Sequence, residues 1–209
     1  MPATILNGTA RRLRIPAVVP YTRVVGLHFN EAKATQAAAC FLRLRGGKMS
    51  YIKLIKLLYL LDREALLRWG RTVTTDRHVS MDKGPVVSQI YDLIREEQPP
   101  GSFGGYWRAY ISAPQDWEVR LLSDPPGDEL SRAEESLIEE IYRIHGTKSR
   151  WELVRYCHDL PEWRDPEGSA LPISYTDILR AGAKPEDEIA AIDEELRNLA
   201  AVEAITRHC

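Results

Sequence analysis

The strongest pattern in the chain is the apolar run YIKLIKLLYLLDREALLRWG at residues 51–70. When successive residues are placed about 100° apart, most of its apolar side chains fall on one half of a helical wheel and the basic ones on the other. Leu57, Leu60 and Leu67 nevertheless lie among the basic side chains. A helix that is apolar nearly all round packs on several sides in a globular protein. The pattern therefore predicts a central helix over this range.

Further helices are predicted where a capping residue precedes an apolar repeat of three to four residues. A capping box, in which serine is followed three residues later by an acidic residue, precedes two of them. The predicted starts are Asn30, Ser50, Ser131, Ser149 and Pro185, and the predicted ends include Gly46, Gly70 and Gly146. Ser174 with Asp177 predicts the start of a short turn. Pro85 is also predicted to begin a helix, because its fixed φ suits the first turn.

Two regions favour β structure. The segment RHVSM at 77–81 alternates and predicts a short strand, and the aromatic segments at 105–111 and 117–122 predict a hairpin around SAPQD. With the helices, these features predict a mainly α (α+β) fold: a compact helical bundle around a central apolar helix, with a small β-hairpin.

The charge distribution separates the first 26 residues from the rest. The chain has 209 residues and a net charge of -2, which fits one domain without a strong overall basic field. Residues 1–26 carry four arginines and no acid, so we expect a basic N-terminal arm followed by a domain over 27–209. The arm is interpreted as disordered, as an extended strand on the domain, or as a nucleic-acid contact.

Cysteine usage and hydropathy indicate the compartment. The three cysteines, Cys40, Cys157 and Cys209, are far apart and do not form a disulfide framework, which is typical of a reducing compartment. The N-terminus has no apolar segment of a signal peptide, and no run reaches the roughly 20 apolar residues of a membrane span. We therefore expect a cytoplasmic protein that does not enter a membrane.

Polar residues of the central helix are candidates for function. Asp62 lies in the apolar half, so we expect it to pair with an arginine elsewhere or to serve as a catalytic acid. Lys56, Leu60, Arg63 and Leu67 form a basic stripe, with Lys53 also on the basic half. Such a stripe is a candidate partner-binding surface, or the docking site of the acidic last helix.

A second candidate partner surface is the segment PPGSFGGYWRAY at 99–110. Its glycines make it pliable, and aromatic residues dominate binding energy at many interfaces. Tyr106, Trp107 and Tyr110 are its candidate anchors, unless Trp107 and Tyr110 simply pack the predicted hairpin on the core.

Catalytic and metal-binding patterns are weak. Cys157 and His158 are adjacent on a predicted helix and point about 100° apart, so they cannot hydrogen-bond to each other as nucleophile and base. The remaining histidines are scattered without metal-ligand spacing. We expect no enzyme activity, no cofactor and no metal.

Three blocks of sequence resemble the Panacea antitoxin domain, the SocA-like or phage-associated antitoxin family. They are KLIKLLYLLDREAL at 53–66, VSMDKGPVVSQIYDLI at 79–94 and ELVRYCHDLPEW at 152–163. The family-motif residues that we single out in them are Tyr59, Gly84, Pro85, Val86, His158 and Trp163.

The resemblance implies a function as well as a compact helical fold with a small β element. It implies an antitoxin of a type II toxin–antitoxin system, which neutralises a cognate toxin encoded nearby by direct protein–protein binding. Alternatives are a proteolytic adaptor that delivers the toxin to a AAA+ protease, or a DNA-binding transcriptional regulator. The arm before Phe29 is too short for the DNA-binding module that some members carry, so DNA is the less favoured partner.

Overall fold

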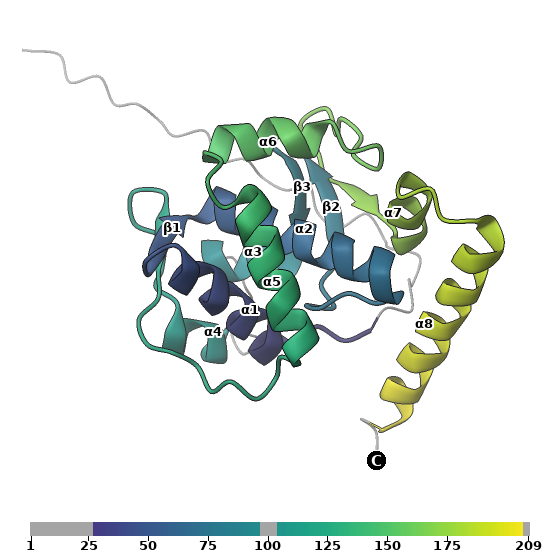
Figure 1. Cartoon of the computed structure of the whole chain (residues 1–209), viewed down its shortest axis with the longest axis horizontal. Coiled ribbons are helices and arrows are strands. Elements are labelled where there is room, and N and C mark those ends of the chain that lie inside the picture. Colours follow the sequence, from purple (N-terminus) through teal and green to yellow (C-terminus); the bar gives the residue numbers. More distant parts are fainter. Residues whose placement is uncertain (1–26, 97–103, 207–209) are drawn as a thin grey trace, which may run out of the picture.

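The computed structural model describes residues 27–96 and 104–206 (Figure 1). The elements run α1 (Glu31–Leu44), β1 (Lys48–Ser50), α2 (Tyr51–Trp69), β2 (His78–Met81), β3 (Gly84–Val87), α3 (Ser88–Arg95), α4 (Gly105–Tyr110), β4 (Glu118–Arg120), α5 (Arg132–His145), α6 (Arg150–His158), β5 (Leu171–Ile173), α7 (Tyr175–Ala181) and α8 (Glu186–Thr206). The predicted basic arm lies outside the described residues.

Helix α2 is the centre of the fold, as predicted. It contacts α1, α3, α5, α6, α7, β1 and β3, and these elements surround it in Figure 1. Every residue from Ile52 to Asp62 is buried, so the apolar character on all sides of the helix is explained by packing on all sides. Gly70 ends the helix with a φ of 68°, a left-handed conformation that glycine adopts without steric cost.

The helix starts follow the capping signals. Asn30 accepts a hydrogen bond from the backbone N–H of Lys33 at the start of α1, and Ser131, Ser149 and Ser174 each form a complete capping box before α5, α6 and α7. Ser50 occupies the predicted cap position of α2 but makes no side-chain capping bond. Short-range side-chain contacts therefore set the starts of α1, α5, α6 and α7.

The prediction that Pro85 begins a helix is wrong. Residues 84–87 form β3, which pairs antiparallel with β2, and α3 begins only at Ser88. In the three-stranded sheet the order is β3-β2-β5, so β3 is an edge strand, where a residue without an N–H is tolerated. Val86 and Val87 are β-branched and buried, which also favours a strand.

The predicted hairpin is only partly present. Residues 105–110 form helix α4 rather than a strand, and β4 pairs with β1. Only the bridges Ile111–Leu121 and Gln115–Glu118 close a short turn. The buried residues Trp107 and Ile111 are four apart, which is a helical spacing, and Ala109 between them is exposed. Aromatic content indicated a strand here, but the burial pattern is that of a helix.

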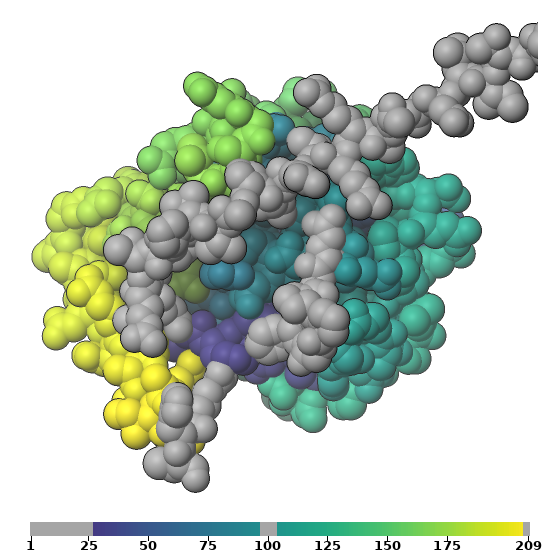
Figure 2. All heavy atoms as spheres, turned by 180° about the vertical axis from the view of Figure 1, so that it is seen from behind, coloured from purple at the N-terminus to yellow at the C-terminus, as the bar shows by residue number. Residues whose placement is uncertain are grey.

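Helix α8 packs beside α7 at one side of the molecule. Seen from behind, this C-terminal helix (yellow) and the region around α4 and β4 (teal) lie on opposite sides (Figure 2). A Cβ placed on Gly70 would lie 3.3 Å from Ile192 Cγ1, so α8 approaches α2 at its C-terminal end. No helix in the described part of the chain combines the length and the apolar character needed to cross a bilayer.

Candidate functional site

Five polar side chains of α2 bind four other segments of the chain. They are Lys53, Lys56, Tyr59, Asp62 and Arg63, of which only Arg63 is partly exposed. A buried polar group is costly unless it is hydrogen-bonded, and a buried charge more so. The partners of these five groups therefore show which contacts the fold depends on.

Lys53 binds the end of α5. Its Nζ donates hydrogen bonds to the carbonyl oxygens of Gly146 at 2.5 Å and Lys148 at 2.7 Å. A cation is favoured at the C-terminus of a helix, where carbonyl groups lack partners within the helix. Burial lowers the pKa of Lys53, with a further contribution from Arg45.

Lys56 and Gly84 join α2 to the β2–β3 hairpin. The Nζ of Lys56 donates a hydrogen bond to the carbonyl oxygen of Pro85 at 2.6 Å. Gly84 has a φ of 85°, and a Cβ there would lie 3.1 Å from both Lys56 Nζ and His158 Cδ2. Only glycine satisfies both the backbone conformation and this close approach.

The segment after α6 closes over the same hairpin. The rings of His158 and Trp163 stack with centroids 4.3 Å apart, and Trp163 Nε1 donates to the carbonyl oxygen of Met81 at 3.2 Å. The backbone N–H of Arg164 donates to Ser80 Oγ at 3.2 Å. The two family-motif residues His158 and Trp163 thus hold the end of α6 against β2, as a structural contact.

Glu162 is the partner of two of the α2 side chains. Its Oε1 accepts hydrogen bonds from the Tyr59 hydroxyl at 2.8 Å and from Arg63 Nε at 2.7 Å. Burial, followed by the negative charge of Glu162, raises the pKa of Tyr59 well above its usual value. Local sequence patterns could not single out Glu162 as a partner, because about 100 residues separate it from both Tyr59 and Arg63.

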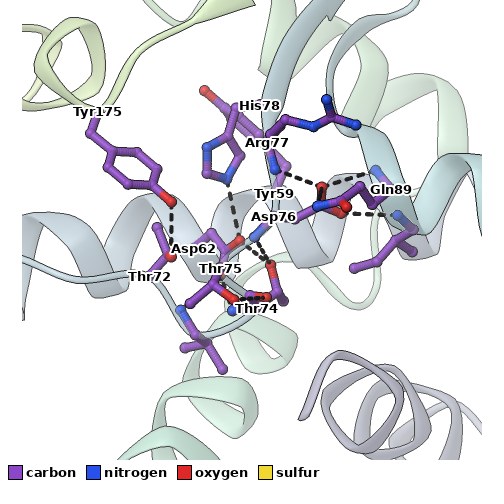
Figure 3. A network of polar contacts seen from close by, with 12 residues as sticks. Tyr59, Asp62, Thr72, Thr74, Thr75, Asp76, Arg77, His78, Gln89 and Tyr175 are labelled. Atoms are coloured by element: carbon purple, nitrogen blue, oxygen red, sulfur yellow. Dashed lines mark hydrogen bonds and ion pairs between the residues drawn. The ribbon is translucent and has the colours of Figure 1, made fainter. Parts of the chain in front are cut away.

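Asp62 binds the loop between α2 and β2 (Figure 3). Its carboxylate accepts hydrogen bonds from the backbone N–H groups of Val73 at 2.9 Å and Thr74 at 2.8 Å, from the Thr74 hydroxyl, and from His78 Nε2 at 3.2 Å. The prediction of an arginine partner is therefore wrong. Asp62 is fully buried among donors from this loop and from His78 at the start of β2, and it is not positioned in an open site.

A second buried carboxylate in the same loop, that of Asp76, organises the start of α3. It accepts hydrogen bonds from the backbone N–H groups of Gln89 and Ile90, both at 2.9 Å, and from that of Arg77 at 2.6 Å. These two α3 groups have no partners within their own helix, so Asp76 caps α3 from outside it. Burial raises the pKa of Asp76 to about 6, although its hydrogen bonds act in the opposite direction.

The basic stripe is not an exposed surface. Lys56 and Leu60 are buried, Leu67 packs against Gly182 at the end of α7, and Arg63 is engaged by Glu162. Lys53 is buried as well. The acidic residues of α8 do not cover the stripe either: Glu186, Glu188 and Asp193 pair with Arg180, Lys184 and Arg197. Lys53, Lys56 and Arg63 bind carbonyl or carboxylate oxygens within the fold, so they do not form a free basic surface.

The aromatic segment is divided between core and surface. Trp107 is buried, and its backbone N–H donates to Glu31 Oε1 at 2.8 Å, which fixes α4 to the start of α1. Tyr106 and Tyr110 remain partly exposed, with ring centroids 4.9 Å apart. Among the three predicted anchors, only these two tyrosines are accessible to a partner.

Cys157 lies at the centre of the junction between α2, β3 and α6. Burial raises the pKa of its thiol to about 11, despite the nearby Lys56. A thiol is nucleophilic only as the thiolate, so this position is chemically inert near neutral pH. His158 directs its ring toward Trp163 instead of pairing with the thiol.

The fold and these contacts define a small helical domain whose central helix is tied by polar side chains to a hairpin and to the segment after α6. The family model described as "Antitoxin SocA-like, Panacea domain" matches residues 54–164, more than half of the chain. The chain belongs to this family. Comparisons with curated proteins and with solved structures give no match.

The matched region contains the contacts of Lys56 with Pro85, Tyr59 with Glu162 and Asp62 with His78. The three blocks that carry the resemblance thus meet in one place, around Gly84. Their residues serve mainly to hold the fold together.

Proposed function

We propose that this chain is the antitoxin of a type II toxin–antitoxin system and that it neutralises a cognate protein toxin by direct contact in the cytoplasm. Membership of the SocA-like Panacea family is the observation that carries the proposal. The role is one of binding, without catalysis. The positions of the motif residues support this, because Tyr59, Gly84, Pro85 and Val86 are buried and the rings of His158 and Trp163 stack on each other.

The toxin contact is proposed to lie on exposed side chains outside these interior contacts. Trp117 and Trp151 are 57% and 46% exposed, which is unusual for tryptophan. Lys83 Nζ lies 5.9 Å from the centroid of the Trp117 ring and 5.8 Å from that of the Trp151 ring. We call these three residues the tryptophan patch. Tryptophans dominate the binding energy of many interfaces, so this patch is the first surface to test.

Co-expression with the neighbouring gene tests the function. If that gene is toxic alone and this chain restores growth, the antitoxin role is supported; if no neighbouring gene is toxic and rescued, the proposal fails. Toxin levels that rise when a AAA+ protease is deleted would instead support the adaptor role.

Variants of the tryptophan patch test the surface. Trp151→Ala and Trp117→Ala should each weaken toxin binding at least about tenfold, as truncation of a central anchor does. Trp69→Ala is the matched control, because Trp69 is also exposed but lies at the C-terminal end of α2, roughly 27 Å along the helix from Tyr51, whose ring stacks with that of Trp117. Unchanged toxin binding by both patch variants would mean that the toxin contacts another surface. Tyr106 and Tyr110 would then be the next residues to test.

A further inference from the structure

A cavity of about 220 Å³ lies beside the N-terminal half of α2, next to the β2–β3 turn. Ile52, Ile55 and Val86 provide apolar parts of its wall, and Trp117 also lines it. A cavity of this size holds a single side chain or a molecule with few heavy atoms, since sites for drug-sized ligands start near 300 Å³. None of the contacts described for the family motif fills it.

Lys56 is also part of the wall of this cavity. Its side chain is almost fully buried, at 1% exposure for the residue, yet within the described part of the chain its ammonium group makes one hydrogen bond, to Pro85. An ammonium group can donate three. Lys53, by comparison, is held by two carbonyl oxygens at a helix end.

The absence of a carboxylate beside Lys56 among the described residues is the unusual feature. Buried charges are normally paired, because an unpaired one is costly to remove from water. Burial lowers the pKa of Lys56 to about 7, so the side chain is held between its charged and neutral forms near neutral pH. An anion that reached the ammonium would favour the charged form.

The other charged residues that line the cavity are mostly basic, like Lys56. Among the described lining residues, Lys56, Lys83 and Arg95 are basic and Asp82 is acidic. A lining that combines apolar and basic side chains is complementary to a ligand that has one negative group and an apolar body.

We propose that this cavity binds a carboxylate carried on a short apolar stem, with the carboxylate on the Lys56 ammonium and the stem between Ile52, Ile55 and Val86. This binding site goes beyond the proposed antitoxin function and does not depend on it. The same chemistry can be supplied by a free small carboxylic acid or by the C-terminus of a polypeptide.

Calorimetric titration of the full chain tests the site. The probes are 4-methylpentanoate and its neutral amide, 4-methylpentanamide, which share the apolar stem and differ in charge. The acid should bind, and the amide should bind at least about tenfold more weakly, because a charge-assisted hydrogen bond is lost. Equal binding of acid and amide, or binding of neither, overturns the proposal.

Two variants locate the site. Lys56→Met keeps the stem without the charge and should weaken acid binding at least about tenfold. Ala170→Phe should block the cavity from a lining position while leaving Lys56 in place. Lys184→Met is the control and should bind as the parent does, because Lys184 pairs with Glu188 of α8 and does not line the cavity. Acid binding that survives both cavity variants would place the ligand elsewhere and refute the assignment.

A peptide arm identifies the source of the carboxylate. Acetyl-Ala-Ala-Leu with a free C-terminus is compared with the same peptide carrying a C-terminal amide. Displacement of the acid by the free peptide but not by the amide assigns a polypeptide terminus to the site. Binding of 4-methylpentanoate without displacement by the peptide assigns a free small acid.

Discussion

The Lys56 ammonium group donates to the carbonyl oxygen of Pro85, a residue that itself has no N–H to offer its strand. This bond joins the buried centre of α2 to the edge strand of the sheet. Lys56 is the first residue to test because it affects stability in two opposite ways. Its hydrogen bond to Pro85 stabilises the fold, whereas the burial of its charge destabilises it.

Lys56→Met is expected to change stability in a pH-dependent way. Burial lowers the pKa of Lys56 from 10.5 to about 7, so between these values the unfolded chain binds more protons than the folded one. Stability from this group therefore rises as pH increases from 7 to about 10.5, by at most roughly 5 kcal/mol. The methionine variant should be more stable than the parent at pH 6.

Well above pH 10.5, where the lysine is neutral in both states, the order should reverse, because the variant lacks the bond to Pro85, worth roughly 1 kcal/mol. Urea denaturation at several pH values measures both effects. Lys48→Met, on an exposed lysine, should show no such reversal. A constant difference between parent and Lys56→Met would contradict the account of its burial.

Gly84→Ala should destabilise the protein more than Gly46→Ala. The two glycines have φ values of 85° and 90°, so both substitutions carry a similar backbone cost of roughly 1–2 kcal/mol. Only at Gly84 does the added Cβ also press on Lys56 Nζ and His158 Cδ2, whereas nothing lies within 4 Å at Gly46. Thermal and chemical unfolding of the pair isolate the steric part, and equal losses would argue against a crowded junction.

Asp62→Ala should be among the most destabilising single changes in the chain. It leaves buried donors of Val73, Thr74 and His78 without an acceptor, each worth about 1–3 kcal/mol. Asp62→Asn should lose less, because its remaining oxygen can still accept the two backbone N–H groups. Free energies of unfolding from denaturant titration should rank parent, Asn and Ala in that order.

Arg63 and Glu162 should be strongly coupled in a double-mutant cycle. The Glu162 side chain is fully buried and that of Arg63 is 15% exposed, so each variant alone leaves a charge without its partner. For Arg63→Gln and Glu162→Gln we expect a coupling energy of about 1–3 kcal/mol. The exposed pair Arg180 and Glu186 is the comparison, and its coupling should be much smaller. Similar coupling in both cycles would mean that the burial of Glu162 is unimportant.

Local signals predicted the helices well, because capping depends on residues three positions apart. Ser131 with Glu134 and Ser149 with Glu152 set the starts of α5 and α6 without information from the rest of the fold. The even apolar distribution of α2 likewise predicted its central position.

Long-range pairing explains the errors. Pro85 lies in a strand because Ser80 pairs with it across the hairpin and Lys56 binds its carbonyl oxygen, and neither contact is visible in a local pattern. For the same reason the partners of Asp62 and Tyr59 could not be predicted from the sequence. Their burial, and so their need for partners, could be. Lys53 and Lys56 are buried, so they cannot be part of the predicted partner surface. The amphipathic appearance of a helix does not show which of its charged side chains are buried.

The polar side chains along α2 have a consequence for the uniqueness of the native state. A central helix with only apolar side chains could rotate, or shift by one residue, among its neighbours at little cost in free energy. In this protein, side chains on successive turns of α2 bind separate neighbours. Lys53 binds the end of α5, Lys56 binds the hairpin, Tyr59 binds the segment after α6, and Asp62 binds the loop that follows α2. A shift in register would leave all four groups without their partners at once, so α2 has a single position within the fold.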